Sequence, residues 1–256
     1  MSDSTPPLST TPRLYVPGLP GAGLHVPGLP GGGDEVRLEG PQAHYLGHVM
    51  RRQPGDMVRL FDGVQGEWAA RVKAVTKKAV VLVLEAPSAP QETVPDLWLC
   101  FAPLKRGRID WLVEKACELG VARLVPVQTR RTIVDRLNPE RLMAHMVEAA
   151  EQCGRTALPE LAAMVTLPVL LAGWPEGRAL YFADEGLAGT APAFAGLAGA
   201  PPAAILVGPE GGFTPEEAEA IRARPAARPV SLGPRILRAD TAAIAAIAAW
   251  QAKQHS

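Results

Sequence analysis

The hydrophobic pattern changes between the first and second parts of the chain. From residue 34 to residue 85, apolar and polar residues alternate over short runs, which is typical of strands with one buried face. This pattern predicts strands at Met57–Phe61, Glu67–Val75 and Ala79–Leu84 and a short helix at Ala43–Met50. The first part is therefore expected to form a small, barrel-like β module.

After residue 95, short apolar runs alternate with longer stretches of helical periodicity. The apolar runs predict strands at Asp96–Ala102, Arg123–Gln128, Ala179–Ala183, Ala203–Val207 and Pro229–Leu232. Strands separated by helices form parallel sheets with both faces covered. The second part is therefore expected to be an α/β domain.

Capping signals place helices between these strands. An apolar stripe over Ile109–Leu119 ends at Gly120, and a second helix begins at the pair Asn138–Pro139. A capping box at Thr214–Glu217 starts a third helix, and Thr241–Gln251 forms the last. One side of the last helix faces either the core or a second subunit, and it carries Ile244, Ile247 and Trp250.

Local composition marks the boundaries between these parts. Residues 1–12 are rich in Ser, Thr and Pro, and we expect them to be a disordered extension. The β module is expected over residues 13–86, with a Pro/Gly-rich insertion at 16–33 in which VPGLPG occurs twice. The proline-rich residues 87–95 are expected to be a linker, which leaves residues 96–256 for the α/β domain.

Overall composition restricts the partners and the compartment. The 256 residues include 26 Lys+Arg and 26 Asp+Glu, so a polyanion has to bind to local basic patches. Cys100, Cys117 and Cys153 are widely spaced, which indicates reduced thiols in the cytoplasm rather than disulfides or a zinc site. No membrane span, secretory signal or metal is expected.

Candidate chemistry concentrates in two glycine-centred turns near the carboxyl terminus. GPEGGF and LGPRIL each follow an apolar run, and glycine lets the backbone approach a ligand because no Cβ intervenes. Neither turn has the Lys-Ser/Thr ending of a phosphate loop, and Glu210 favours a ligand with hydroxyls, an amine or a positive centre. The apolar slot of Leu232, Ile236 and Leu237 suits a purine. The turns predict an adenosine-like ligand without phosphate; two plain strand-to-helix connections are the alternative.

These turns belong to a longer series of motifs. GPEGGF followed by LGPRILRADTA resembles the signature of the bacterial 16S ribosomal RNA uridine-N3 methyltransferases, a family of the SPOUT superfamily. Lys105–Val121 and Glu148–Arg155 resemble further segments of that family. Arg13–Tyr15, His44–Arg51 and Gly55–Gly63 resemble its N-terminal RNA-binding module. The resemblance extends over most of the chain.

The resemblance implies a fold, a cofactor and an assembly. The fold is a PUA-like β-barrel followed by a SPOUT-type α/β domain with a deep trefoil knot. S-adenosylmethionine is the implied cofactor, and a homodimer is the implied assembly. The cofactor-binding residues implied by the resemblance are Val207, Gly208, Glu210, Gly211, Gly212, Leu232, Gly233, Ile236, Leu237, Arg238 and Thr241.

The implied reaction is methylation of uridine N3 in 16S rRNA of the assembled small ribosomal subunit. N3 is nucleophilic only when deprotonated, so a nearby cation favours the reaction; Arg238 is the first candidate and Arg155 the second. Glu210 is expected to orient the cofactor or act as a base. Asp240 either shares those roles or caps the last helix, and a salt bridge is the structural alternative for Arg238.

RNA contacts are expected from local clusters of basic residues. Arg13, Arg51 and Arg52 lie in the β module. In the α/β domain, Lys105, Arg106 and Arg108 precede the first helix, and Arg130–Arg131 follow a strand. Each set is alternatively a solvated face.

Three other functions stay open. A ribose 2′-O methyltransferase of the same superfamily would share the cofactor turns, and a non-catalytic RNA-binding protein would have a degenerate pocket. A nucleotide-phosphate enzyme is disfavoured because both standard phosphate loops are missing. Cys117 and Asp240 stand where the family usually has Thr and Glu, which leaves their individual roles open.

Overall fold

The computed structural model describes residues 11–19 and 33–254, which form two compact units. The first unit comprises residues 1–93 together with Glu151–Ala157, and the second comprises Val94–Ala150 and Leu158–Ser256. Most of the predicted disordered extension, and most of the predicted Pro/Gly-rich insertion with its repeat, lie outside the described residues.

The first unit is built on a curved five-stranded sheet of order β1-β3-β4-β5-β2. Its strands are β1 (Arg13–Tyr15), β2 (Glu35–Glu39), β3 (Met57–Phe61), β4 (Glu67–Val75) and β5 (Ala79–Ala89). The β1–β3 pair is parallel and the other pairs are antiparallel. Bulges between β4 and β5 shift the register, and bulges of this kind bend a sheet. The result is an open, curved form of the predicted barrel-like module.

Strand β5 is longer than its apolar run predicts and extends into the segment expected to be a linker. The prediction ended at Leu84, but pairing continues to Ala89, which lies opposite Glu67 of β4. Backbone pairing with the long β4 strand keeps the polar residues after Leu84 extended, and a search for apolar alternation misses such residues.

A helical segment covers one side of this sheet where a single helix was predicted. Helix α1 (Gly40–His44) continues directly into a π-helical turn, η2 (Tyr45–Val49). Ala43 and Leu46 are buried in the core of the unit, together with apolar residues of all five strands. The predicted helix is therefore present but begins three residues earlier and loosens at its end.

The second unit is an α/β domain with a parallel sheet of order β12-β10-β11-β6-β7-β8, and β9 pairs with the end of β7. Its strands are β6 (Leu97–Phe101), β7 (Arg123–Gln128), β8 (Glu160–Leu161), β9 (Val165–Thr166), β10 (Ala179–Ala183), β11 (Ala203–Val207) and β12 (Ala227–Val230). Five of these were predicted to within two residues; β8 and β9 have two residues each and give no periodic signal.

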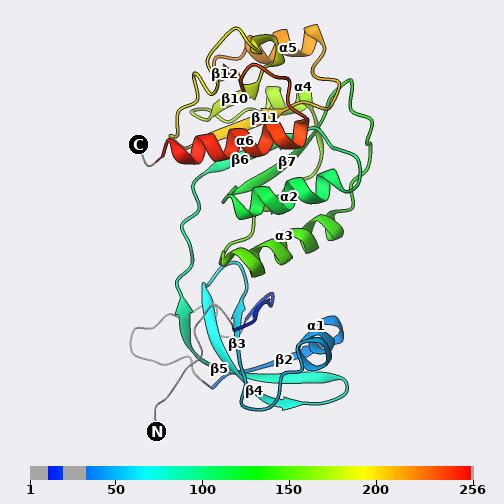
Figure 1. Ribbon diagram of the computed structural model, residues 1–256, viewed down its shortest axis with the longest axis vertical. Helices are drawn as coiled ribbons and strands as arrows, with labels where there is room; N and C mark the ends of the chain where they lie inside the picture. Colours follow the sequence, from blue (N-terminus) through cyan, green and yellow to red (C-terminus); the bar gives the residue numbers. More distant parts are fainter. Residues whose placement is uncertain (1–10, 20–32, 255–256) are drawn as a thin grey trace. The chain divides into compact units, whose positions relative to one another are not determined.

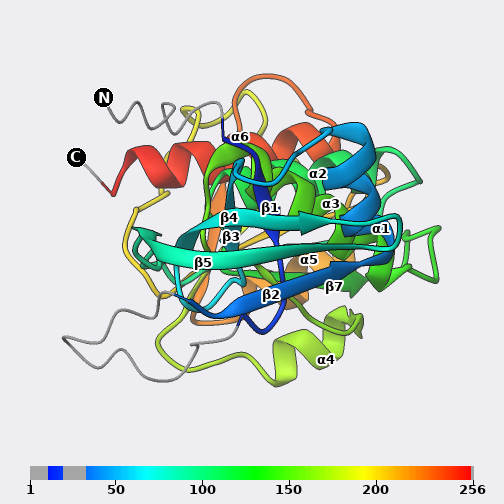
Figure 2. The ribbon, with the colours of Figure 1, turned by 90° about the horizontal axis from the view of Figure 1, so that it is seen from below.

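Helices cover both faces of this sheet (Figure 1 and Figure 2). On one face, α6 (Ala239–Ala252) packs against β11 and against α2 (Arg108–Glu118). On the other, α4 (Leu167–Ala172) and α5 (Pro215–Arg222) bury Leu167, Leu171 and Ile221 against the strands. The predicted two-sided covering is confirmed.

The predicted helix ends are also confirmed. Helix α3 (Pro139–Cys153) starts where the Arg141 N–H donates to the Asn138 side chain at 3.0 Å, and Gly154 follows it with φ +86°. Helix α5 starts at the predicted capping box, in which Thr214 and Glu217 exchange hydrogen bonds. These short-range signals succeeded because they depend only on neighbouring backbone groups.

The apolar side of the last helix points mainly into the core. Ile247 and Trp250 are fully buried within the chain, and Ile244 is half-buried. The core alternative is therefore right for Ile247 and Trp250. Among the described residues, no helix is long and apolar enough to cross a membrane.

Candidate active site

Three neighbouring strands of the second unit end at the same edge of its sheet. Strands β12, β10 and β11 lie side by side and run parallel, so the loops that follow them meet. Together these loops enclose a cavity of about 230 Å³. The carboxyl edge of a parallel sheet is the usual place for a ligand because the connecting loops leave a crevice there.

The first glycine turn forms one wall of this cavity. Gly212 has φ +66°, a conformation that favours glycine, and its N–H donates to the Pro209 carbonyl at 2.9 Å. The Phe213 ring packs beneath Gly208, so closely that a Cβ there would lie 3.1 Å from the ring. The turn therefore presents bare backbone to the cavity, as its sequence predicted.

The second glycine turn forms the opposite wall. Gly233 has φ +110°, and its N–H donates to the Ser231 hydroxyl at 3.3 Å. Leu232 and Leu237 line the cavity, and Ile236 lines it while remaining 74% exposed. The predicted apolar slot is present.

A third wall, which the sequence did not predict, comes from the loop after β10. The cavity is lined there by Asp184, Glu185 and Ala188. Glu185 is the first residue of the short 3₁₀ helix η3 (Glu185–Leu187), and Ala188 follows its last residue. The buried Asp184 carboxylate accepts hydrogen bonds from Arg222 at 2.6 Å and from the Gly186 N–H at 3.0 Å. The end of the predicted strand Ala179–Ala183 was the available signal, because neighbouring parallel strands share an edge.

The charges around the cavity are mixed. Asp184, Glu185 and Glu210 bring carboxylates to its lining, and Arg235 and Arg238 bring two guanidinium groups. Glu210 is partly exposed and pairs with Arg108 at 3.3 Å. An apolar slot beside carboxylates and open backbone suits a ligand with a flat ring and a positive centre.

Arg238 lies at the junction of the second turn and α6. Its carbonyl accepts the first hydrogen bond of the helix from the Ala242 N–H at 2.7 Å. Its exposed side chain forms no hydrogen bond or ion pair with any residue in the described ranges, so the salt-bridge alternative is not seen there. Asp240 is the second residue of α6 rather than its cap, and its carboxylate accepts from the Thr241 N–H at 2.9 Å.

The start of α5, beside the first turn, carries a shifted carboxyl group. Hydrogen bonds lower the pKa of the exposed Glu216 carboxyl: the larger effect comes from the Thr214 hydroxyl and a smaller one from the backbone N–H of Glu216. An ionised carboxylate at a helix start is favourable because it opposes the positive end of the helix dipole.

Most residues expected to bind a cofactor line the cavity together. The members of that set found in the lining are Val207, Gly208, Glu210, Gly212, Leu232, Gly233, Ile236, Leu237 and Arg238. Gly211 and Thr241 are not part of it: Gly211 faces Arg131, and Thr241 is exposed on α6.

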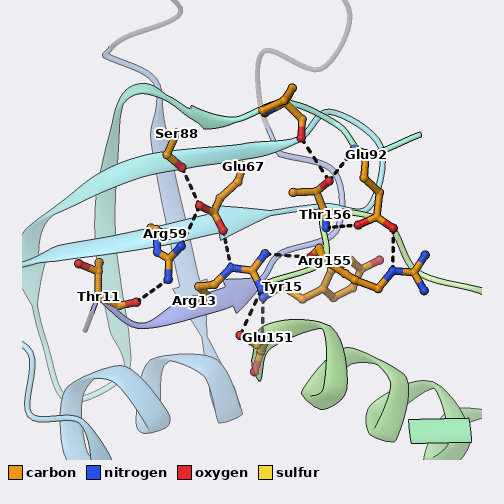
Figure 3. A network of polar contacts seen from close by, with 11 residues as sticks. Thr11, Arg13, Tyr15, Arg59, Glu67, Ser88, Glu92, Glu151, Arg155 and Thr156 are labelled. Atoms are coloured by element: carbon orange, nitrogen blue, oxygen red, sulfur yellow. Dashed lines mark hydrogen bonds and ion pairs between the residues drawn. The ribbon is translucent and has the colours of Figure 1, made fainter. Parts of the chain in front are cut away.

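Two of the predicted functional residues lie in a polar network of the first unit (Figure 3). They are Arg155, which was expected to assist catalysis, and Arg13, which was expected to bind RNA. Arg155 is 7% exposed and donates to Glu92 at 2.7 Å; it does not line the cavity. Arg13 is 8% exposed, pairs with the buried Glu67 and donates to the Arg155 carbonyl at 2.8 Å. These contacts indicate structural roles for both arginines.

The other expected RNA-binding residues are more accessible. Arg51 is exposed and has φ +50°, which is unusual for a residue with a side chain, and Arg52 is half-buried. In the second unit, Lys105 is exposed just before α2, and the half-buried Arg108 pairs with Glu210 in the first turn. Lys105 and Arg108 therefore lie near the start of α2, and Arg108 contacts the cavity wall directly.

Comparisons with known proteins agree with this architecture. Residues 90–251 match the model of an RNA methyltransferase domain, and residues 38–85 match the model of an RNA methyltransferase PUA domain. A curated protein of Rickettsia conorii, Ribosomal RNA small subunit methyltransferase E, is 31% identical over 80% of this chain and 84% of its own. The protein of the same name from Synechocystis is 34% identical over 83% of this chain and 71% of its own.

Several solved structures are similar over nearly the whole chain, and two of them contain a bound cofactor. One is a Legionella pneumophila protein with bound cofactor SAM, 30% identical, covering 94% of this chain and 97% of its own, with a TM-score of 0.79. The other is a Ribosomal RNA small subunit methyltransferase E from Neisseria gonorrhoeae bound to S-adenosyl methionine, 27% identical, with the same coverage and TM-score.

Proposed function

This chain belongs to the RNA methyltransferase family, and on that premise we propose that it methylates N3 of a uridine in 16S rRNA, with S-adenosylmethionine as methyl donor. The observation that carries the proposal is the cavity at the carboxyl edge of β12, β10 and β11. It combines bare glycine backbone, an apolar slot and carboxylates, and none of the described loops that line it is a phosphate loop.

The cavity lining suits each part of the proposed cofactor. Leu232, Ile236 and Leu237 offer apolar surface to an adenine ring, whose edge can form hydrogen bonds with the open backbone of the turns. Glu185 and Glu210 offer carboxylates to ribose hydroxyls and to the positive charges of the methionine part. We assign cofactor binding to these residues together with Val207, Gly208, Gly212, Gly233 and Arg238.

When bound, S-adenosylmethionine supplies an electrophilic methyl group on a sulfonium centre. The chain then has to align uracil N3 with that group and favour loss of the N3 proton. Arg238 lines the cavity and its guanidinium is uncommitted among the described residues, so we assign it the stabilisation of the uridine anion. Glu210 is the nearby carboxylate that can accept the proton.

We propose that RNA also contacts the first unit through the surface of α1 and η2. His44 and His48 stack there with ring centroids 5.0 Å apart, and both are exposed. Tyr45 and Val49 are exposed on the same segment, and Arg51 follows it. Aromatic rings beside positive charge are a common surface for unpaired bases and phosphates. In the second unit, we propose that Lys105 and Arg108 contact RNA.

The finer features implied by the family resemblance are further proposals. We propose a homodimer, supported by the exposed apolar side chains of Trp111 on α2 and Met143 on α3. Those helices are adjacent, since Arg141 and Asp110 pair across them at 2.8 Å. We also propose a trefoil knot, which is supported by the crossing from β11 past β10 to β12. Two further proposals are a cytoplasmic location and the assembled small subunit as substrate.

The test is methyl transfer to small ribosomal subunits from cells that lack this modification. Wild-type protein with labelled S-adenosylmethionine should label 16S rRNA at uridine N3, as located by mass analysis of nucleosides. Arg238→Ala should lower kcat about 10²- to 10³-fold, the usual cost of removing one group that stabilises a developing negative charge. Absence of transfer by wild-type protein, or a methyl group on a ribose 2′ oxygen, would overturn the proposal.

A further inference from the structure

The first glycine turn is held from outside the cavity by the segment that follows β7. In the sheet, β6 separates β7 from β11, the strand that leads into the turn. The segment therefore has to reach across one strand position to contact the turn. It does so through Arg130 and Arg131, which the cavity lining does not include.

A compact turn fixes the position of these two arginines. The Thr129 N–H donates to the Thr132 hydroxyl at 3.0 Å, and the Thr132 N–H donates to the Thr129 carbonyl at 3.2 Å. The two hydroxyls are also 2.9 Å apart, within hydrogen-bond distance. Threonine side chains that satisfy nearby backbone groups in this way stabilise a turn.

Arg131 reaches the carbonyl side of the glycine turn. Its Nη1 donates to the Gly211 carbonyl at 2.5 Å and lies 3.4 Å from the Phe213 carbonyl. Its stem covers the open side of Gly211, where a Cβ would lie 3.4 Å from Arg131 Cδ. A charged donor shared by these two carbonyls restricts the rotation of the Gly211–Gly212 and Phe213–Thr214 peptide units, one on each side of the Gly212–Phe213 step.

A second contact ties the same segment to the end of the turn. Glu217 is 8% exposed. One of its carboxylate oxygens accepts a hydrogen bond from the Arg130 N–H at 2.7 Å, and the other accepts one from the Thr214 N–H at 3.0 Å. The carboxylate thus joins the segment after β7 to the first residues beyond Phe213. Because it caps α5 as well, it holds the turn and the helix start in one arrangement.

We propose that Arg131 is a positioning residue for the cofactor site, acting through the first glycine turn. The bonds of Arg131 hold the backbone of Gly211–Phe213 in the arrangement that the ligand meets, so that binding does not have to order a glycine-rich segment. Glycine loses more conformational freedom than any other residue when it is ordered, so bracing such a turn in advance raises affinity. This inference deepens the proposed function and takes S-adenosylmethionine as the ligand of the cavity.

The neighbouring Arg130 provides a matched control. Its side chain is exposed and forms no hydrogen bond or ion pair with the part of the chain that the structure describes, and its contact with Glu217 uses only the backbone. Arg130→Ala therefore removes one positive charge from the same turn but keeps the contacts to Glu217 and Gly211. Arg131→Lys keeps the charge and one donor.

The experiment measures S-adenosylmethionine affinity by calorimetry without RNA. Arg131→Ala should weaken binding about tenfold, because the ligand then has to order a turn that is no longer held in advance. Its melting temperature should stay close to that of the wild type, because the Arg131 side chain is exposed. Arg131→Lys should recover part of the loss, and Arg130→Ala should bind within about twofold of the wild type. An Arg131→Ala affinity within twofold of the wild type, or an equal loss in Arg130→Ala, would overturn the proposal.

Hydrogen exchange separates failure of this inference from failure of the proposed function. The Gly212 amide, which bonds to the Pro209 carbonyl, should exchange several times faster in cofactor-free Arg131→Ala than in wild-type protein or Arg130→Ala. If wild-type protein does not bind S-adenosylmethionine, the proposed function and the cofactor-positioning role fail together. Faster exchange in Arg131→Ala would then still establish the brace itself, and unchanged exchange would overturn it.

Discussion

The two glycine turns around the cavity differ in how firmly the domain holds them. The first turn is supported by the ring of Phe213, the guanidinium of Arg131 and the carboxylate of Glu217. The second is anchored at its start, where the hydroxyl of the buried Ser231 lies 3.2 Å from the Leu187 carbonyl and 3.3 Å from the Ala191 carbonyl, which share its single O–H. Its middle, Ile236, is 74% exposed.

This difference indicates separate tasks for the two turns. A turn held on several sides offers a ligand a prearranged backbone and loses little entropy on binding. A turn with an exposed apolar side chain gains stability when a ligand covers that side chain. We infer that the first turn sets where the ligand sits, and that the second contributes affinity by closing apolar surface against it.

The largest effect is expected from a side chain on the first turn. Gly212→Ala puts a Cβ at φ +66°, where it overlaps the Glu185 carboxylate. The left-handed conformation costs about 1–2 kcal/mol with a side chain, so the turn shifts and cofactor affinity falls roughly 5- to 30-fold. Calorimetry with S-adenosylmethionine measures the loss.

Gly177→Ala is the control for backbone strain alone. Gly177 has φ +78°, and a Cβ there meets nothing within 4 Å. It precedes β10, at the opposite edge of the sheet from the cavity. This variant should lose about 1–2 kcal/mol of stability but keep its cofactor affinity. Equal affinities of the two variants would show that the first turn does not set the ligand position.

The sequence predicted the two turns but not all the contacts around them. The sequence predicts both turns because neighbouring glycine and apolar residues indicate local backbone structure; these turns are Gly208–Gly212 and Leu232–Leu237. Asp184 and Glu185 were missed because they join the cavity through the order β12-β10-β11, which is a long-range property of the sheet. The support from Arg131 likewise depends on a long-range property, the order β11-β6-β7.

The burial of Arg13 and Arg155 shows the same limit. Arg13 and Arg155 were expected at RNA and at the reacting base because positive charge suits both. Both are buried instead, against Glu67 and Glu92 respectively. The sequence shows that a residue is charged, but the fold decides whether a carboxylate meets it; here the partners are 54 and 63 residues away.

A smaller effect is expected from the exposed apolar side chain of the second turn. Ile236→Ala removes surface that the ligand is expected to cover and should weaken S-adenosylmethionine binding about fivefold, from roughly 1 kcal/mol of lost burial. Stability should not change, because the side chain is 74% exposed without ligand. Ile133→Ala is a matched control: Ile133 is also 74% exposed but does not line the cavity. Equal affinities of both variants would contradict the closing role.

The smallest effect is expected from the ion pair that joins α2 to the first turn. Arg108 and Glu210 are 3.3 Å apart and each side chain is more than one-third exposed, so solvent screens their attraction. A double-mutant cycle with Arg108→Ala and Glu210→Gln, followed by denaturant unfolding, should give a coupling energy below about 0.5 kcal/mol. If the coupling is larger, this pair braces the first turn as Arg131 does. A small coupling together with a marked loss of methyl transfer in Glu210→Gln would support the proposed role of Glu210 at the ligand.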